Sequence, residues 1–262
     1  MTAAALAVGL GVSLFVLPVA WGLTVIGAAF LLGAWEWAGF AQLKPTFRLI
    51  YSAAIGLLMF CAWVWSETTH NLVVLMGTAC VWWLAAFAWI GLAPQWQNRN
   101  VTLGCGALVL VPAYVALARM HVARGVLAPM GLVLAFLLLV FSADIGAYFV
   151  GRWLGRQKLA PRVSPGKTRE GAMGGLALVM LVACAGAYRF HLPLLAVLGL
   201  AGMVGFFSIV GDLTESMFKR AAGLKDSGRL LPGHGGVLDR IDSVTAAAPF
   251  FVLGAIKFGL LT

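Results

Sequence analysis

The sequence predicts an all-α membrane protein that crosses the bilayer about nine times. Of its 262 residues, 62% are hydrophobic and only 10% are charged, and the mean hydropathy is +0.97. A soluble domain carries roughly a quarter charged residues, so a water-facing shell cannot be built from this composition. Lipid must cover most of the surface, which excludes a soluble enzyme, a disordered chain and a disulfide-bonded secreted domain.

Apolar segments separated by proline, glycine and charge clusters give the expected helices. A crossing helix needs about 20 apolar residues, so the length leaves no room for a large soluble domain. We expect helices near residues 4–19, 22–43, 49–66, 71–92, 101–118, 126–149, 171–189, 193–216 and 244–261. Only a short break separates the first two, so eight spans are the alternative.

The distribution of cations predicts the orientation in the membrane. With nine spans, the side of the N-terminus holds Lys44, Arg48, Arg99 and every cation of residues 152–169 and 219–240. The positive-inside rule assigns this side to the cytoplasm. We therefore expect a multi-pass protein of the inner (cell) membrane with a cytoplasmic N-terminus and cytoplasmic basic loops.

The acidic residues are concentrated in the second half of the chain. Seven of the nine are Asp144, Glu170, Asp212, Glu215, Asp226, Asp239 and Asp242. Acids at the ends of apolar helices are costly unless paired, hydrated or metal-bound, so they mark a functional site. We interpret residues 1–125 as a transmembrane scaffold, although Glu36 and Glu67 lie there, and residues 126–262 as the catalytic region.

The first long polar stretch, residues 151–170, ends in Ser164, Gly166, Lys167 and Thr168 just before an apolar helix. A flexible backbone, a cation and a hydroxyl at a helix N-terminus suit a phosphate group. The stretch is not a P-loop, because the first glycine and the preceding strand are missing. A positive-inside loop followed by an ordinary helix start at Thr168 is the alternative.

A second group begins where the span at 193–216 ends. Asp212, Glu215, Ser216, Lys219 and Arg220 would share one face if the helix continues. A solvated helix end with internal ion pairs would have the same pattern.

A glycine-rich segment leads into the last span. Three glycines around His234 would let the backbone approach a ligand closely. His234 has no second His or Cys at ligand spacing, so it is expected to bind phosphate and not zinc. If the helix has already begun there, Asp239 and Asp242 lie one helical turn apart, which suits oxygen ligands of a hard cation.

These segments resemble the signature of phosphatidate cytidylyltransferases, also called CDP-diacylglycerol synthases. The residues that carry the resemblance are Ser216, Met217, Phe218, Lys219, Arg220, Lys225, Asp226, Ser227, Gly228, Leu231, Pro232, Gly233, His234, Gly235, Gly236, Val237, Leu238, Asp239, Arg240, Ile241 and Asp242. The segments Asp144 to Tyr148 and Ser164 to Gly171 are similar to upstream blocks of the same family.

The resemblance implies a polytopic, dimeric enzyme that condenses CTP with phosphatidic acid to CDP-diacylglycerol and pyrophosphate. It also implies Mg²⁺, alone or with a second cation, on Asp212 and Asp239, to which we add Asp242. We expect catalytic roles for Lys219, Arg220, Lys225, His234 and Arg240, and substrate contacts for Ser164, Lys167, Thr168, Asp144, Glu215, Ser216 and Asp226.

Two alternative functions remain open, and nucleic-acid binding is excluded. A cytidylyltransferase for an ether or isoprenoid lipid phosphate would carry the same signature, because the signature contacts phosphates and not lipid tails. An ion-coupled transporter would place acids near the bilayer midplane in two related halves, whereas these acids cluster at one boundary. Nucleic acid is excluded as a partner because no basic soluble face is present.

Overall fold

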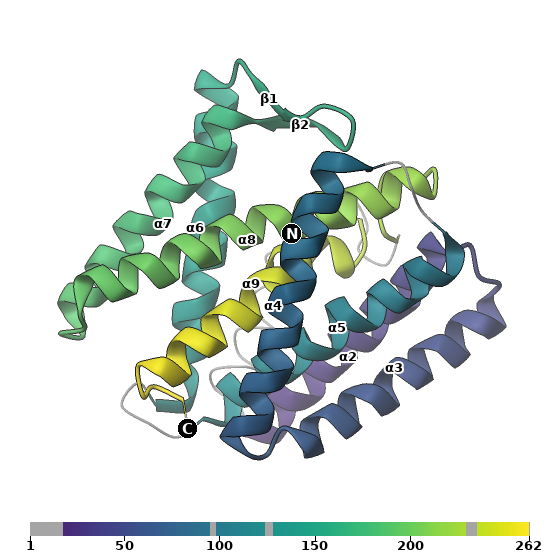
Figure 1. Cartoon of the computed structure of the whole chain (residues 1–262), viewed down its shortest axis with the longest axis horizontal. Helices are drawn as coiled ribbons and strands as arrows, with labels where there is room; N and C mark the ends of the chain where they lie inside the picture. The colour runs from purple at the N-terminus through teal and green to yellow at the C-terminus, as the bar shows by residue number, and fades with distance from the viewer. Residues whose placement is uncertain (1–17, 95–97, 124–127, 229–234, 262) are drawn as a thin grey trace.

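The computed structural model describes residues 18–94, 98–123, 128–228 and 235–261 (Figure 1). Eight helices lie within these ranges: α2 (Val19–Phe40), α3 (Pro45–Trp65), α4 (Thr69–Leu92), α5 (Arg99–Val122), α6 (Ala128–Leu154), α7 (Arg169–Arg189), α8 (Leu194–Ala221) and α9 (Leu238–Lys257). Each overlaps one of the helices expected from the sequence. The remaining expected helix, residues 4–19, lies almost entirely outside the described residues.

Seven of the described helices, α2 to α8, are long and apolar enough to cross a membrane. Large apolar side chains such as Leu57, Phe60, Val81 and Leu181 point outward from the bundle. An extensive apolar surface of this kind would be unstable in water and suits contact with lipid. The chain is therefore a multi-pass membrane protein, with seven candidate spans in its described part.

The helices form a bundle in which α8 and α9 lie between two outer groups (Figure 1). On one side, α6 and α7 pack as an antiparallel pair, and α7 also packs against α8. On the other side, α2 packs against α3 and α5, and α5 contacts α9. The last two helices therefore connect the N-terminal helices with the pair formed by α6 and α7.

The core lies where α2, α5, α8 and α9 meet. Trp37 of α2 is 1% exposed, and its ring centroid lies 5.0 Å from that of Phe218 in α8. The indole Nε1 of Trp37 donates a hydrogen bond of 2.7 Å to the carbonyl of Thr102 in α5. This packed contact supports the end of α8 at which the signature residues lie.

Helices α8 and α9 approach each other most closely at Gly211. A Cβ at this position would lie 2.5 Å from the carbonyl oxygen of Asp242 and 2.8 Å from Cβ of Ala246. No side chain fits at that separation, so glycine allows the backbones to touch. The contact brings Asp212, the next residue of α8, beside Asp242 of α9.

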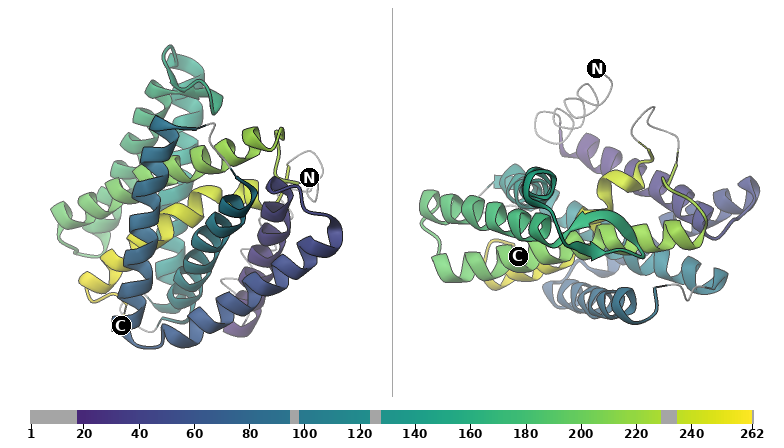
Figure 2. Two further views of the ribbon diagram at one scale, coloured as in Figure 1. Left: turned by 45° about the vertical axis from the view of Figure 1, so that its right-hand side comes forward. Right: turned by 90° about the horizontal axis from the view of Figure 1, so that it is seen from above.

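Residues 151–170, expected as a loop, contain a β-hairpin at the end of the α6–α7 pair (Figure 2). Strand β1 (Lys158–Ala160) pairs antiparallel with β2 (Ser164–Thr168). The N–H of Val163 donates to the carbonyl of Ala160 at 3.1 Å, and the Val163 side chain is buried. The sequence did not reveal these strands because Pro165 and Gly166 interrupt any alternating pattern.

Candidate active site

The last turns of α8 present a polar face. The helix continues to Ala221, five residues beyond the expected end, so the polar residues of this segment do share one face. Ser216 Oγ donates to Asp212 Oδ1 at 3.4 Å, and Lys219 Nζ lies 3.4 Å from Glu215 Oε1. The pairing follows the four-residue spacing of a helix.

Three helices bring four acids together, which we call the carboxylate cluster: Asp144 of α6, Asp212 and Glu215 of α8, and Asp242 of α9. Asp144 interacts electrostatically with Asp212 and accepts a hydrogen bond from the Ser243 side chain. Lys167 reaches in from β2 and forms an ion pair with Asp212. The side chains of this pair are 27% and 30% exposed, so solvent reaches the cluster here.

Two members of the cluster place their carboxyl groups in contact. Glu215 is only 2% exposed. Among the described residues, neither of its oxygens has a hydrogen-bond partner. Its neighbours are Lys219 and the carboxyl group of Asp242. Burial and the nearby Asp212 raise the pKa of Asp242 to about 7. The contact therefore needs a proton or a cation to offset repulsion.

Asp239, in the first turn of α9, is held by a second network of contacts. Its Oδ1 accepts a hydrogen bond of 2.6 Å from Lys219 Nζ. Its Oδ2 accepts bonds from Ser227 N–H at 3.0 Å, Ser227 Oγ at 3.0 Å and Gly236 N–H at 2.8 Å. Burial alone would raise the pKa of Asp239, but these donors outweigh it and lower that pKa below its ordinary value.

Asp239 and Asp242 diverge although they begin the same helix. Helix α9 starts at Leu238, six residues before its expected start, so both acids are helical. Asp239 contacts Lys219 and Ser227, whereas Asp242 belongs to the carboxylate cluster. Lys219 links the two groups because it pairs with both Glu215 and Asp239.

The other expected site residues lie around this centre. Thr168 caps α7, its Oγ1 accepting a 3.1 Å hydrogen bond from Gly171 N–H, as an ordinary helix start would. Ser164 begins β2 and is partly exposed. Arg220 is exposed and donates to the carbonyl of Leu224 at 3.3 Å.

The glycine-rich segment is only partly described. Lys225, Asp226 and Arg240 are exposed on either side of it. His234 lies outside the described residues. Gly235 and Gly236 were expected to bring backbone close to a ligand. Gly235 lies against the carboxylate of Asp239, and Gly236 lies against Ser227 Oγ and the carboxylate of Glu36.

Glu36 belongs to this site although the sequence placed it in the scaffold. It is 2% exposed in α2, and its carboxylate accepts hydrogen bonds from Ser227 Oγ and from the N–H groups of Val237 and Leu238. An acid inside an apolar span is costly unless it has partners. A buried acid in α2 therefore indicated that partners exist. The sequence could not identify them, because they lie 191 to 202 residues away in the chain.

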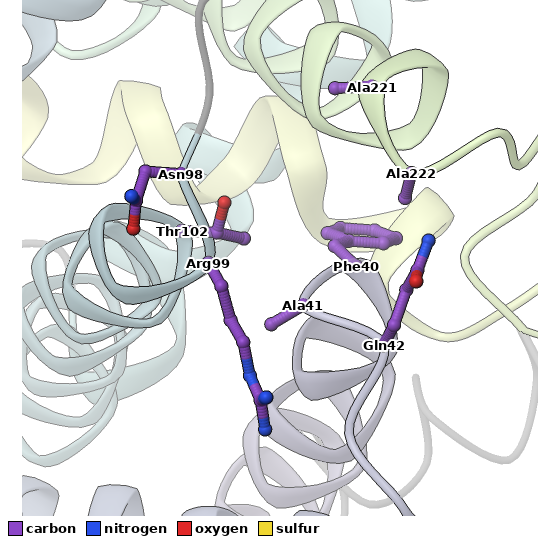
Figure 3. A pocket seen from close by; sticks show the side chains of 8 residues that line it. All are labelled: Phe40, Ala41, Gln42, Asn98, Arg99, Thr102, Ala221 and Ala222. Atoms are coloured by element: carbon purple, nitrogen blue, oxygen red, sulfur yellow. The ribbon is translucent and has the colours of Figure 1, made fainter.

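A separate pocket of about 300 Å³ lies at the same end of the bundle (Figure 3). It is lined by Phe40, Ala41, Gln42, Asn98, Arg99, Thr102, Ala221 and Ala222. The end of α2, the start of α5 and the end of α8 therefore meet here. Arg99 therefore lies beside the C-terminal end of α8.

The donor set agrees with a hard divalent cation such as Mg²⁺. The carboxylate cluster supplies only oxygen ligands, which Mg²⁺ prefers, and within the described residues neither Glu215 oxygen has a hydrogen-bond partner. Over the described ranges, however, no three acidic, His or Cys side chains converge in a metal-binding arrangement. In this conformation Lys167 supplies the positive charge beside Asp212.

Acids and lysines grouped at one end of apolar spans indicate a membrane enzyme that acts on a polyanionic substrate. They argue against a transporter. The model of the cytidylyltransferase family matches residues 1–256. Because the match covers nearly the whole chain, the protein belongs to the cytidylyltransferase family, as the signature predicted.

Three similar proteins are all named phosphatidate cytidylyltransferase. The chain is 47% identical to a phosphatidate cytidylyltransferase of Pseudomonas aeruginosa over 249 residues, which cover 90% of this chain and 88% of the relative. It is 39% identical to that of Haemophilus influenzae over 254 residues, 86% of each chain. It is 40% identical to that of Brucella suis over 235 residues, 85% of this chain and 80% of the relative.

Proposed function

We propose that this protein transfers the cytidylyl group of CTP to phosphatidic acid and forms CDP-diacylglycerol and pyrophosphate. Full-length similarity to phosphatidate cytidylyltransferases supports this reaction. The observation that carries it structurally is the Lys167–Asp212 ion pair. It joins the hairpin and the end of α8, the two segments with the residues expected to bind phosphate and cation.

The attacking atom is a phosphate oxygen of phosphatidic acid. It forms a bond to the α-phosphorus of CTP, the bond from that phosphorus to the β-phosphate bridging oxygen breaks, and pyrophosphate leaves with the electron pair. A phosphate monoester, with a second pKa of about 6, is already largely ionised at neutral pH. A strong general base is therefore unnecessary.

The main barrier is repulsion between two polyanions, so positioning and neutralisation of charge supply the catalysis. Lys167, with Ser164 and the Thr168 hydroxyl, binds a phosphate at the hairpin. Lys219 organises Glu215 and Asp239. The triphosphate is bound by His234 and by three exposed cations, Arg220, Lys225 and Arg240.

Asp212 and Asp242 would hold Mg²⁺, with Asp144 and Glu215 beside them. Asp239 would be a further ligand; its Oδ1 now pairs with Lys219, and its Oδ2 accepts hydrogen bonds from Ser227 and Gly236. When bound, Mg²⁺ neutralises phosphate charge and polarises the phosphoryl group. Ser216 orients Asp212, and Asp226 lies at the entrance of the loop.

The reaction takes place at the cytoplasmic face of the inner (cell) membrane in a homodimer. Asp144 and Asp212 lie in the C-terminal halves of α6 and α8, and the Lys167–Asp212 pair is partly open to solvent, so a lipid headgroup in the bilayer and a soluble nucleotide can meet there. The cations of this side support the orientation through the positive-inside rule. Accessibility of single cysteines placed at Lys158 and Lys257 to an impermeant reagent would test the orientation.

The decisive assay incubates purified protein with labelled CTP, Mg²⁺ and phosphatidic acid in mixed micelles. CDP-lipid and pyrophosphate should form in equal amounts. Diacylglycerol, which lacks the nucleophilic phosphate, is the control substrate and should give neither. Faster turnover of an ether or isoprenoid lipid phosphate than of phosphatidic acid would identify that lipid as the substrate instead. No turnover of any lipid phosphate would contradict the proposed function.

A further inference from the structure

Glu36 lies in α2, far in sequence from every signature residue, yet it is bonded to the signature segment. Its Oε1 accepts a hydrogen bond of 3.0 Å from Val237 N–H. Its Oε2 accepts bonds of 2.8 Å from Leu238 N–H and 2.9 Å from Ser227 Oγ. Three donors therefore converge on one buried carboxylate.

This carboxylate caps the helix that carries Asp239 and Asp242. The N-cap residue of α9 is Val237, and its side chain makes no capping hydrogen bond. The first N–H groups of a helix need acceptors, and a negative charge is favourable there. Glu36 supplies both from a neighbouring helix.

The surrounding backbone is shaped around Glu36. A Cβ at Gly228 or at Gly236 would overlap the Glu36 carboxylate, and one at Gly236 would also overlap Ser227 Oγ. Both ends of the glycine-rich segment therefore pass directly over this side chain. Such contact leaves little room for Gly228 or Gly236 to shift without displacing Glu36.

Ser227 connects Glu36 to Asp239. Its Oγ lies 2.9 Å from Glu36 Oε2 and 3.0 Å from Asp239 Oδ2, so its single hydroxyl hydrogen is shared between two carboxylates. Asp239 in turn accepts from Lys219, which also pairs with Glu215 of the carboxylate cluster. A continuous set of polar contacts thus runs from α2 to the reaction centre.

We propose that Glu36 is a positioning residue for the cytidylyl transfer, and this inference rests on the proposed function. It fixes the start of α9 and the position of Ser227 so that Asp239 and Lys219 stay aligned with the carboxylate cluster. Glu36 touches neither substrate and acts through Ser227 and the two N–H groups.

Glu36→Gln is the sharpest variant because it changes charge and donor pattern but not size. A glutamine amide has one acceptor oxygen and one NH₂ group. Whichever way it turns, the NH₂ faces a backbone N–H of residue 237 or 238. The matched control is Glu67→Gln, which removes the other acid of the N-terminal half at an exposed loop position.

The test measures kcat and KM in the mixed-micelle assay, together with the thermal midpoint of each purified variant. Losing a partner that orients catalytic carboxylates typically costs roughly 10- to 100-fold in activity. Glu36→Gln should lower kcat by this factor, while KM for phosphatidic acid changes by less than about threefold. Glu67→Gln should match the wild type.

A second pair keeps the inference testable if Glu36→Gln does not fold. Ser227→Ala removes the bridge but leaves Glu36 on the α9 N–H groups, and Ser227→Thr restores the hydroxyl. Reduced kcat in the first and recovery in the second would support the positioning role. Wild-type kcat in folded Glu36→Gln, or in Ser227→Ala, would overturn it. An inactive wild type would instead refute the proposed function.

Discussion

Lys167 of strand β2 forms an ion pair with Asp212 near the end of α8. The hairpin and the helix are otherwise joined by few contacts, so this pair determines where the hairpin cation lies relative to the acids. Both side chains are partly open to solvent. An anionic substrate can therefore compete for Lys167, and a cation can replace it beside Asp212.

Replacing Lys167 should weaken substrate binding. The Lys167→Ala variant loses a charge-assisted contact to phosphate, which is worth about 1.5–3 kcal/mol, and KM for CTP or phosphatidic acid should rise about 10-fold or more. Lys158→Ala, on the exposed start of β1, is the matched control and should leave both KM values unchanged. Unchanged KM values in Lys167→Ala would contradict the assignment.

Removing the Asp239 carboxylate should abolish turnover. Asp239→Ala leaves Lys219 without its 2.6 Å partner and frees the N–H groups of Ser227 and Gly236. Activity should fall below about 1% of the wild type, because transition-state charge stabilisation depends on aligned groups. Membrane insertion, measured by fractionation, should be normal. Turnover near the wild-type rate would remove Asp239 from the site.

Stability without divalent cations should fall as pH rises. The pKa of Asp242 is about 7 in the folded protein, against 3.8 for an ordinary aspartate. Between pH 3.8 and about pH 7, Asp242 is protonated in the folded protein but ionised in the unfolded chain. The free energy of unfolding therefore decreases as pH rises through this window. In EDTA, the thermal midpoint should be lower at about pH 8 than at about pH 5 by roughly a few degrees.

The Asp242→Asn variant separates this effect from other titrations. It should flatten the decrease in thermal midpoint between the two pH values. Mg²⁺ should stabilise the wild type more at the higher pH, because the metal binds the deprotonated cluster and competes with protons. An equal pH dependence in variant and wild type would exclude Asp242 as its source.

Enlarging Gly211 should separate α8 from α9. A methyl group at this position meets the Asp242 carbonyl and Ala246, so Gly211→Ala should cost about 1–3 kcal/mol through overpacking and reduce activity. Gly199→Ala is the control in the same helix, since no neighbouring atom lies within 4 Å of a Cβ there. It should be neutral or slightly stabilising. Equal thermal midpoints for the two variants would refute the close-packing argument.

The apolar helices could be predicted because a membrane span depends on composition and length. The expected ranges 71–92 and 171–189 differ by no more than two residues from α4 and α7. Helix ends that carry charge were harder to predict. The last span was expected to begin near residue 244, whereas α9 begins at Leu238, where Glu36 caps it from α2.

The sequence by itself determined the class of protein, the candidate residues and the side of the bundle on which they lie. The tertiary structure decided how those residues divide, with Asp242 in the carboxylate cluster and Asp239 bound to Lys219 and Ser227. It alone brought Glu36 into the site. Composition and spacing report local free energies, whereas contacts between distant segments depend on how helices pack, and here Gly211 allows that packing.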